Sequence, residues 1–399
     1  MTAAGIGPIE DVLMPGSHCS FASKRGTVPF VLSLCLPVSV ANAQHPVLAP
    51  TSDTTITVGS GALHYSSILI PAGVTVRFAA PGLGGYTPGT PAVVFCDGDA
   101  IVHGMMSVSG EIAAAYPAGW VTTGAGAPGY VCGSGASFNP PQGGSHAGAY
   151  GSVIPFSLDG GSFGGALAQY PWCLGGTPTV VWGGTGGGTL ALLAQGRIEV
   201  DGTVAADGLH YGSVTGSISP GGGSGGSILL SGAGGVTILP TGRVTARGGT
   251  ALNAHPTTVG APGYIRLDAW GTAPIIQGTV DPPPTTLELP HLRARTQLRI
   301  GSTWLLDVLA PENAPIYVAA SLLPGPGTPT PFGSLGLDLP TAANLAVTSA
   351  QPSHDPIATV PWPVPNAPFL IGLQLWVQAL AIPPTLPPRL SNTLHATVQ

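Results

Sequence analysis

The sequence predicts an all-β protein, with a parallel β-helix (a solenoid) followed by a small β-sandwich. Short apolar runs that alternate in and out recur along the chain with glycine between them, as in strands that cover one core. No stretch shows a sustained 3.6-residue period with helix caps. The hydrophobic fraction is 44%, although only 7% of residues are charged, so the chain has the apolar content needed to fold.

Residues 1–43 are predicted to be a signal peptide rather than part of the fold. The basic pair Lys24-Arg25 precedes the apolar run 28–40, and Ala41-Asn42-Ala43 follows as a cleavage signal. The run is shorter than the roughly 20 residues that span a bilayer. We expect export through a signal peptide cleaved between Ala43 and Gln44, to the medium or the cell surface. A buried strand in place of the apolar run, and translation from Met14, remain alternatives.

A degenerate repeat organises the predicted β-helix, which spans residues 44–280. Each copy has an alternating strand, a corner with glycine and a second strand, and the spacings between successive corner glycines are 31, 98, 40 and 36 residues. The spacing of 98 predicts an insertion at about residues 111–188. Units this small cannot bury their own apolar face, so they must stack. The corner glycines are Gly73, Gly104, Gly202, Gly242 and Gly278.

The strands of this repeat are expected to turn one side toward a common core. Glycine at each corner is expected because it adopts positive φ at the least cost. An irregular β meander or a β-sandwich is the alternative fold for this region. The residues predicted to face the core are Ile198, Val200, Val204, Val244 and Ile265.

The repeat texture of residues 54–280 resembles glycine-rich, right-handed parallel β-helix proteins that bacteria secrete, related in shape to pectin lyases. The chain lacks the asparagine ladders of that family and the strings Asn-Thr-Asp, Asp-Asp, Gly-His-Gly and Arg-Ile-Lys of its enzyme members. The resemblance therefore implies the shape and export, without implying an activity.

Residues 281–287, which begin Asp281-Pro282-Pro283-Pro284, are predicted to be a stiff proline linker. Beyond it glycine thins out, and short alternating runs separated by proline-rich turns predict a β-sandwich over residues 288–399. The stretch 364–379, together with Leu390-Ser391-Asn392, resembles a C-terminal module of secreted bacterial proteins. That resemblance implies export and surface display.

Three cysteines remain after the predicted cleavage. An exported compartment permits disulfides, and Cys132 and Cys173 both lie in a glycine-rich, loop-like region, so we pair them. Other pairings stay open. Cys96 ends an apolar run and is expected to be a buried free thiol.

A possible catalytic group comprises Asp201, Asp207, Asp268 and Arg197. Paired carboxylates with an arginine suit glycoside hydrolysis or lyase chemistry, if they converge in one groove. The alternative places them separately, on outward strand positions and turns. The string Gly222-Gly223-Ser224-Gly225-Gly226 matches a nucleophile elbow, but a strand follows it where that motif needs a helix.

Several chemistries are excluded or disfavoured by composition. Lys24 is the sole lysine, so the predicted mature chain has no lysine nucleophile, and the net charge of −6 argues against nucleic acid as a partner. Asp97 and Asp99 form a weak calcium candidate. The ten histidines are scattered, which disfavours a zinc site. We expect no cofactor and no transmembrane segment in the mature chain.

The insertion is rich in large aromatic side chains set among glycines. Flat rings on an exposed loop stack on sugars, although they would equally cover a small core of the insertion itself. These candidate ligand-binding residues are Trp120, Tyr130, Tyr150, Tyr170, Trp172 and Trp182. We therefore expect a non-catalytic structural or adhesive protein, secreted or displayed at the cell surface, that binds extracellular polysaccharide or a cell-surface component. The alternative is a polysaccharide lyase or glycoside hydrolase on the same scaffold.

Overall fold

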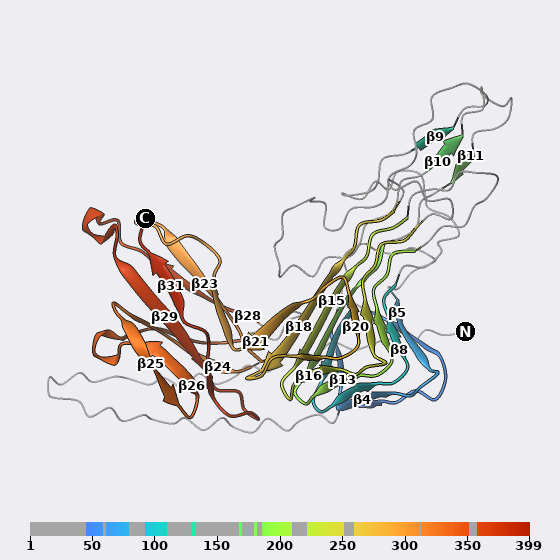
Figure 1. The fold of residues 1–399 in the computed structure, drawn as a ribbon, viewed down its shortest axis with the longest axis horizontal. Helices are drawn as coiled ribbons and strands as arrows, with labels where there is room; N and C mark the ends of the chain where they lie inside the picture. Colours follow the sequence, from blue (N-terminus) through green and yellow to red (C-terminus); the bar gives the residue numbers. More distant parts are fainter. Residues whose placement is uncertain are drawn as a thin grey trace, which may run out of the picture. The chain divides into compact units, whose positions relative to one another are not determined.

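The computed structural model describes most of the chain after the predicted leader (Figure 1). The described residues are 45–58, 61–79, 92–109, 186–209, 222–250, 259–311, 313–350 and 357–399, with the backbone of three short strands at 129–131, 167–169 and 179–181. Every described residue belongs to one compact unit, Gln44–Gln399. Within these ranges no helix is long and apolar enough to cross a membrane.

Three parallel six-stranded sheets, which we name A, B and C, form the β-helix that the sequence predicts. Sheet A contains β1 (Val47–Leu48), β4 (Ser67–Ile70), β7 (Ala100–Val102), β13 (Ile198–Val200), β16 (Val236–Ile238) and β19 (Ile275–Ile276). Sheet B contains β2 (Thr54–Thr57), β5 (Thr75–Ala79), β8 (Met105–Ser107), β14 (Thr203–Ala205), β17 (Arg243–Thr245) and β20 (Thr279–Asp281). Sheet C contains β3 (Leu63–Tyr65), β6 (Ala92–Cys96), β12 (Thr189–Ala194), β15 (Ser227–Gly232), β18 (Tyr264–Trp270) and β21 (Thr285–Leu289).

The chain visits the sheets in the order A, B, C six times, so the solenoid has six coils. Neighbouring coils are in register: Leu192 pairs with Val94 on one side and with Leu230 on the other. Between β8 and β12 the chain leaves the third coil, at the insertion that the sequence predicts. That excursion contains the small sheet of β9 (Gly129–Val131), β10 (Leu167–Gln169) and β11 (Thr179–Val181).

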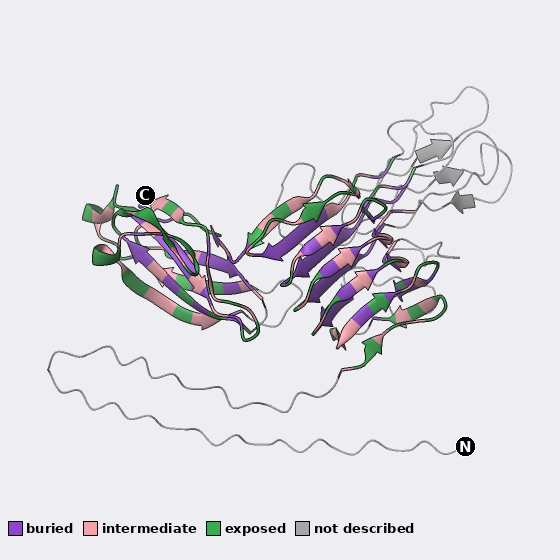
Figure 2. Ribbon diagram, turned by 60° about the horizontal axis from the view of Figure 1, so that its bottom comes forward, coloured by how far each residue is buried: buried purple, intermediate pink, exposed green. Residues whose placement is uncertain are grey.

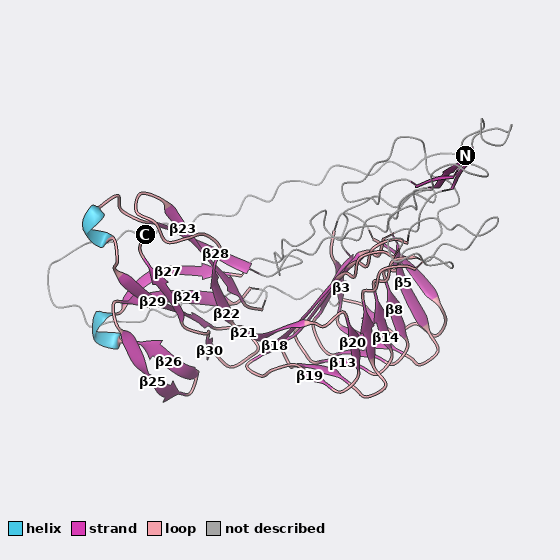
Figure 3. Cartoon of the chain, turned by 45° about the horizontal axis from the view of Figure 1, so that its top comes forward, coloured by secondary structure: helices cyan, strands magenta, loops and turns pink. Residues whose placement is uncertain are grey.

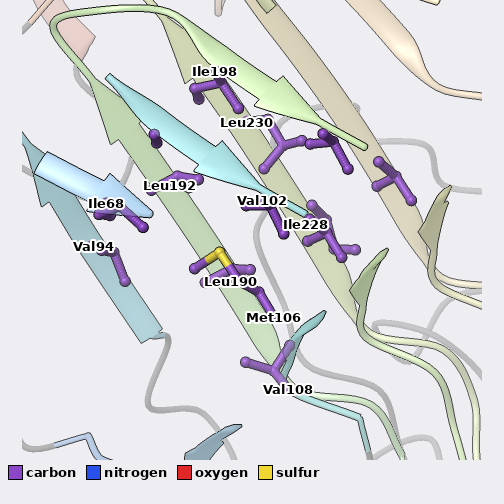
Figure 4. Close-up of a cluster of buried hydrophobic side chains, with 14 of the residues drawn as sticks. Ile68, Val94, Val102, Met106, Val108, Leu190, Leu192, Ile198, Ile228 and Leu230 are labelled. Carbon is purple, nitrogen blue, oxygen red and sulfur yellow. The ribbon is translucent and has the colours of Figure 1, made fainter. Parts of the chain in front are cut away.

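Inward side chains of the three sheets form one continuous apolar core along the coils (Figure 4). Ile68, Val102, Leu190, Ile228 and Leu230 are each no more than 1% exposed. The five residues predicted to face the core, Ile198 among them, all have 0% exposure, which confirms the assignment of the strand faces. Each fully buried aliphatic side chain contributes about 1.5–3 kcal/mol. Stacking thus supplies the burial that a single coil lacks.

The five corner glycines all lie where sheet A turns into sheet B, one in each of coils two to six. The repeat was therefore identified in the correct register, but the predicted reason for glycine holds only at Gly73, whose φ is +79°. At the other four a Cβ would collide with a backbone carbonyl of the preceding coil: Gly202, for example, would strike the oxygen of Gly104. Close approach of successive coils, rather than positive φ, requires glycine there.

The four central strands of sheet C are buried on both faces (Figure 2), whereas sheet A strands such as β13 and β16 alternate between buried and partly exposed residues. The outward side chains of sheet C form a second apolar cluster that runs across β6, β12 and β15. The cluster consists of Val93, Phe95, Ala191, Leu193 and Leu229. Both strands β12 and β15 are buried along their full length, which explains why they read as continuous apolar runs in the sequence.

The solenoid ends after β21 rather than at residue 280. Pro282, Pro283 and Pro284 form the short B-to-C connection of the sixth coil, and β21 pairs with β18. The proline run is thus a corner inside the solenoid and does not link two domains. Proline fits there because the connection needs no N–H donors for a ladder.

Two antiparallel sheets follow and share one core, as predicted for a β-sandwich (Figure 3). The smaller sheet contains β22 (His291–Ala294), β23 (Thr303–Leu309) and β28 (Ile357–Pro363). The larger contains β24 (Pro315–Ser321), β27 (Ala343–Ser349), β29 (Gln374–Ala381), β30 (Arg389–Leu390) and β31 (Leu394–Thr397). The hairpin β25 (Pro324–Thr330) and β26 (Gly333–Leu337) completes the region, with the 3-10 turns η2 (Leu339–Thr341) and η3 (Pro368–Leu370).

A buried carboxylate ties the smaller sheet together. Asp307 on β23 is 0% exposed, and its Oδ2 accepts hydrogen bonds from Arg293 Nη2 at 3.1 Å and from Arg295 Nε at 2.9 Å. Its Oδ1 accepts one from Thr359 Oγ1 at 2.9 Å. Strands β22, β23 and β28 are therefore joined through one charged group as well as through their ladders.

Candidate functional site

Asp201 lies at the A-to-B corner of the fourth coil, in a polar ladder that runs across three coils. One carboxylate oxygen accepts a hydrogen bond from Thr241 Oγ1, and the other lies 3.4 Å from His103 Nδ1. The hydrogen bond from Thr241, followed by that from His103 and its charge, lowers the pKa of Asp201. The side chain is thus an ionised group that links neighbouring coils at this corner, and each of its two oxygens has a partner.

Asp207 lies at a different corner, where sheet B turns toward sheet C. Its backbone N–H donates to Ser109 Oγ at 3.0 Å, Oδ1 accepts from the Arg247 N–H at 2.7 Å, and Oδ2 accepts from Thr245 Oγ1 at 2.9 Å. Arg247 in turn pairs with Asp281 of the next coil at 2.6 Å. This second ladder fixes the register of four coils at the corner from which the long loops depart.

Asp268 lies on the outer face of sheet C and is 2% exposed. It forms a buried ion pair with Arg266, which is 1% exposed: Arg266 Nε lies 3.1 Å from Oδ1, and Nη2 lies 3.0 Å from Oδ2. Breaking such a buried pair is strongly destabilising, because it leaves a charged group buried without a counter-ion. Its carboxylate is therefore held by its own arginine within one strand.

The catalytic group considered from the sequence is distributed over separate parts of the solenoid. Asp201 and Asp207 occupy two different corners and Asp268 a sheet face. Arg197 lies at the third corner, where its Nε is 3.4 Å from Asp99 and its Nη1 is 3.5 Å from Glu199. The described residues thus do not bring this arginine and these three carboxylates into one groove, which the enzymatic alternative requires.

The two carboxylates of the calcium candidate, Asp97 and Asp99, have different partners. Asp97 pairs with His45, whose Nδ1 lies 2.8 Å from its Oδ2. Asp99 accepts a hydrogen bond from the Arg197 backbone N–H at 2.9 Å. Over the described part of the chain, no three His, Cys, Asp or Glu side chains gather in a way that would hold a metal ion.

Ser224, the serine of the elbow-like string, is 0% exposed. Its backbone carbonyl accepts the Gly187 N–H at 2.9 Å, and the segment around it is extended, without a following helix. The string is therefore part of a packed backbone layer, and its hydroxyl is not presented to a substrate.

The most distinctive feature is a hydrogen-bonded layer of glycine-rich segments that extends from the B-to-C corner. We call it the glycine stem. Long connections leave the third, fourth and fifth coils at this corner, and the stem consists of the first and last residues of each connection. Its segments are residues 108–109, 186–188, 206–209, 222–226, 246–250 and 259–263.

Each stem segment bonds to neighbours on more than one side, unlike a strand of a flat sheet. Returning segments bond to each other, as in the Gly225 N–H to Ala261 C=O bond of 2.9 Å. Outgoing segments do the same, as in Gly208 N–H to Arg247 C=O at 2.8 Å. Returning segments also bond to outgoing ones, as in Gly226 N–H to Ala206 C=O at 2.7 Å. The backbone itself therefore holds the stem together.

This packing needs glycine at several positions, because the neighbouring backbone leaves no room there for a Cβ. A Cβ on Gly187 would collide with the Ala206 carbonyl, and a Cβ on Gly226 with the Gly188 carbonyl. The same holds for Gly263 against Gly226. Sequence reasoning treated these residues as loops. The available signal was the occurrence of glycine near both ends of each long connection.

The stem supports the insertion that carries the predicted aromatic and cysteine residues. The side chains of those residues lie outside the described residues, as do Cys132 and Cys173 themselves; Tyr130 is located only through the backbone of β9. What the structure does describe is the base: residues 108–109 leave from β8, and residues 186–188 return to β12, hydrogen-bonded by Gly188 N–H to Val108 C=O at 2.7 Å.

Comparison of the chain with protein-family models, with curated proteins and with solved structures found no match.

Proposed function

We propose that the chain is an exported, non-catalytic binding protein, secreted or held at the cell surface. The solenoid and its glycine stem present the insertion of residues 111–188 to extracellular polysaccharide or another cell-surface component. The C-terminal β-sandwich caps or anchors the solenoid. The observation that carries this proposal is that the long connections of three successive coils leave from one corner through one hydrogen-bonded stem.

The physical argument concerns how a binding segment is held. A long connection without support has large conformational entropy, and ordering it on binding weakens affinity. The stem joins the two ends of each connection to each other and to those of the next coil. The six candidate aromatic residues, from Trp120 to Trp182, all lie between the two stem segments 108–109 and 186–188. Rings in such a segment are suited to stacking on sugars.

The carboxylates give less support to the enzymatic alternative. Asp201 and Asp268 would have to converge with an arginine, and each is engaged with partners at a separate place on the solenoid. Turnover of acidic or neutral polysaccharides by the purified chain would overturn the non-catalytic proposal.

The binding proposal is tested on an array of extracellular polysaccharides. The full chain is compared with a variant in which residues 111–185 are replaced by a short Gly-Ser linker, so that the stem segments remain. We expect the replacement to abolish binding while the far-ultraviolet circular dichroism of the solenoid persists.

A second variant, Trp120→Ala combined with Trp172→Ala and Trp182→Ala, tests ring stacking alone. A matched variant, Trp362→Ala in the β-sandwich, controls for the loss of an aromatic residue elsewhere. Binding that survives replacement of residues 111–185 would refute the assignment of the site to the insertion.

A further inference from the structure

Three side chains from separate parts of the sequence meet at the C-to-A corner near the N-terminal end of the solenoid. His45 immediately precedes the first coil, His64 lies on β3, and Asp97 follows β6. The corner is positioned by backbone bonds, including Ser66 N–H to Pro46 C=O at 2.9 Å. His45 and Asp97 are 35% and 47% exposed and His64 is exposed, so the group is open to solvent.

The contact with Asp97 assigns the two nitrogens of the His45 ring. A carboxylate accepts hydrogen bonds and donates none, so His45 Nδ1, which lies 2.8 Å from Asp97 Oδ2, carries the proton. In the neutral ring Nε2 then has a free lone pair. A histidine whose second nitrogen donates to a carboxylate is the usual arrangement of a metal ligand, because the carboxylate fixes the tautomer and the ring orientation.

A second imidazole lies at a distance suitable for sharing one metal ion. The ring centroids of His45 and His64 are 5.1 Å apart, with 38° between the planes. Two imidazoles bound side by side on one ion, each with a metal–nitrogen distance of about 2.0–2.1 Å, have centroids about 4.5–5 Å apart at metal-centred angles of about 90–110°, a range that includes tetragonal copper(II). The His64 ring also stacks on Phe95, with 4.8 Å between the two ring centroids.

We propose that His45 and His64 bind a divalent late-transition-metal ion, copper(II) in preference to the others, with Asp97 as the residue that orients His45. Imidazole nitrogens suit copper, nickel and zinc, and copper(II) stands first in the general affinity order for such donors. No third His, Cys, Asp or Glu side chain joins them among the described residues, so water occupies the remaining positions. The site is independent of the insertion and of the proposed polysaccharide binding.

The chain offers a matched control on the same solenoid. His103 also directs Nδ1 toward a carboxylate, that of Asp201 at 3.4 Å, and both side chains are 38% exposed. The described ring contacts place no second imidazole beside it. A carboxylate-paired histidine without a neighbouring imidazole should bind copper(II) far more weakly. His103→Ala therefore removes a comparable side chain without removing the proposed site.

The test titrates copper(II) chloride into the purified full chain, followed by calorimetry and electron paramagnetic resonance. We expect one tight equivalent, with nitrogen hyperfine splitting from two imidazoles, that is lost in His45→Ala and in His64→Ala. Asp97→Asn should weaken that equivalent about ten-fold or more. His103→Ala should leave it unchanged, and circular dichroism checks that each variant is folded.

Two results would overturn the proposal. One is a wild-type chain without a tight equivalent of copper(II). The other is a double variant, His45→Ala with His64→Ala, that binds as many equivalents with the same affinity as the wild type. Loss of the equivalent in His103→Ala as well as in His45→Ala would also refute the assignment, because binding would then require a histidine outside the proposed pair.

Discussion

Substitution of Gly226 by alanine tests whether the stem depends on the absence of side chains. Gly226 N–H donates to Ala206 C=O at 2.7 Å, and the next residue, Ser227, donates to Gly188 C=O at 3.0 Å. An alanine Cβ would collide with that Gly188 carbonyl and with Gly187. To relieve the overlap the segment must move, and both hydrogen bonds are weakened in a buried place.

The magnitude follows from those two bonds. Leaving a buried donor or acceptor without its partner costs about 1–3 kcal/mol each. Alanine offsets about 0.4–1 kcal/mol of this cost, because it lowers the conformational entropy of the unfolded chain. The free energy of unfolding is therefore expected to fall by about 3 kcal/mol. An unfolding entropy of about 2.1 cal/mol/K per residue over roughly 350 residues converts this loss into a fall in Tm of about 4 °C.

Differential scanning calorimetry measures this change against a matched glycine. Gly61 lies outside the strands, has no positive φ, and would have no atom within 4 Å of a Cβ. Gly61→Ala should therefore leave Tm unchanged or raise it slightly. If Gly226→Ala melts within about 1 °C of the wild type, the close packing of the stem does not contribute to stability and the reasoning fails.

Three further predictions concern the core and two titratable groups. Leu230→Ala, at a position of 0% exposure, should lose about 2–5 kcal/mol by chemical denaturation, whereas Leu69→Ala, at 42% exposure, should change stability by less than about 0.5 kcal/mol. Burial, and then the positive charge of Arg293, lowers the pKa of His291 below its usual 6.5, so the unfolded chain binds the proton better. Stability should consequently fall as pH drops below 6.5, and His291→Asn should reduce that fall in pH-dependent melts. Burial raises the pKa of Cys96 to about 11, so iodoacetamide at pH 8 should label this thiol only after unfolding, and rapid labelling of the native chain would contradict its burial.

The fold was accessible from the sequence because it depends on short-range patterns. Strand faces follow from alternation, and residues such as Ile198 and Val244 were assigned to the core correctly. Corner glycines were found through their spacing. The reason for glycine at Gly202 was not accessible, since the atom that a Cβ would strike belongs to Gly104, nearly a hundred residues earlier. A spacing shows that coils repeat, but it does not show how close they approach.

The site was less accessible for a related reason. Whether Asp201 and Asp268 converge depends on which corner or face of a coil each one occupies. That placement depends on the lengths of the connections between strands, and the connections have no hydrophobic periodicity from which a position could be predicted. The pairing of His45 with Asp97 likewise joins residues two coils apart. Histidines that are scattered along the sequence become neighbours only once the coils are stacked.

The glycine stem connects the unusual composition with the proposed function. The stem segments are held together by backbone hydrogen bonds to neighbours on several sides. Gly225 bonds to Ala261 in this way, and Ser224 to Gly187. At positions such as Gly187 and Gly226 a side chain would collide with neighbouring backbone, which is consistent with the 61 glycines of the chain. Because main-chain hydrogen bonds hold the described stem segments, we expect substitutions between residues 110 and 185 to leave the solenoid folded. A scaffold of this kind places recognition in the segments it carries, and so the polysaccharide test is directed at the insertion and not at the solenoid.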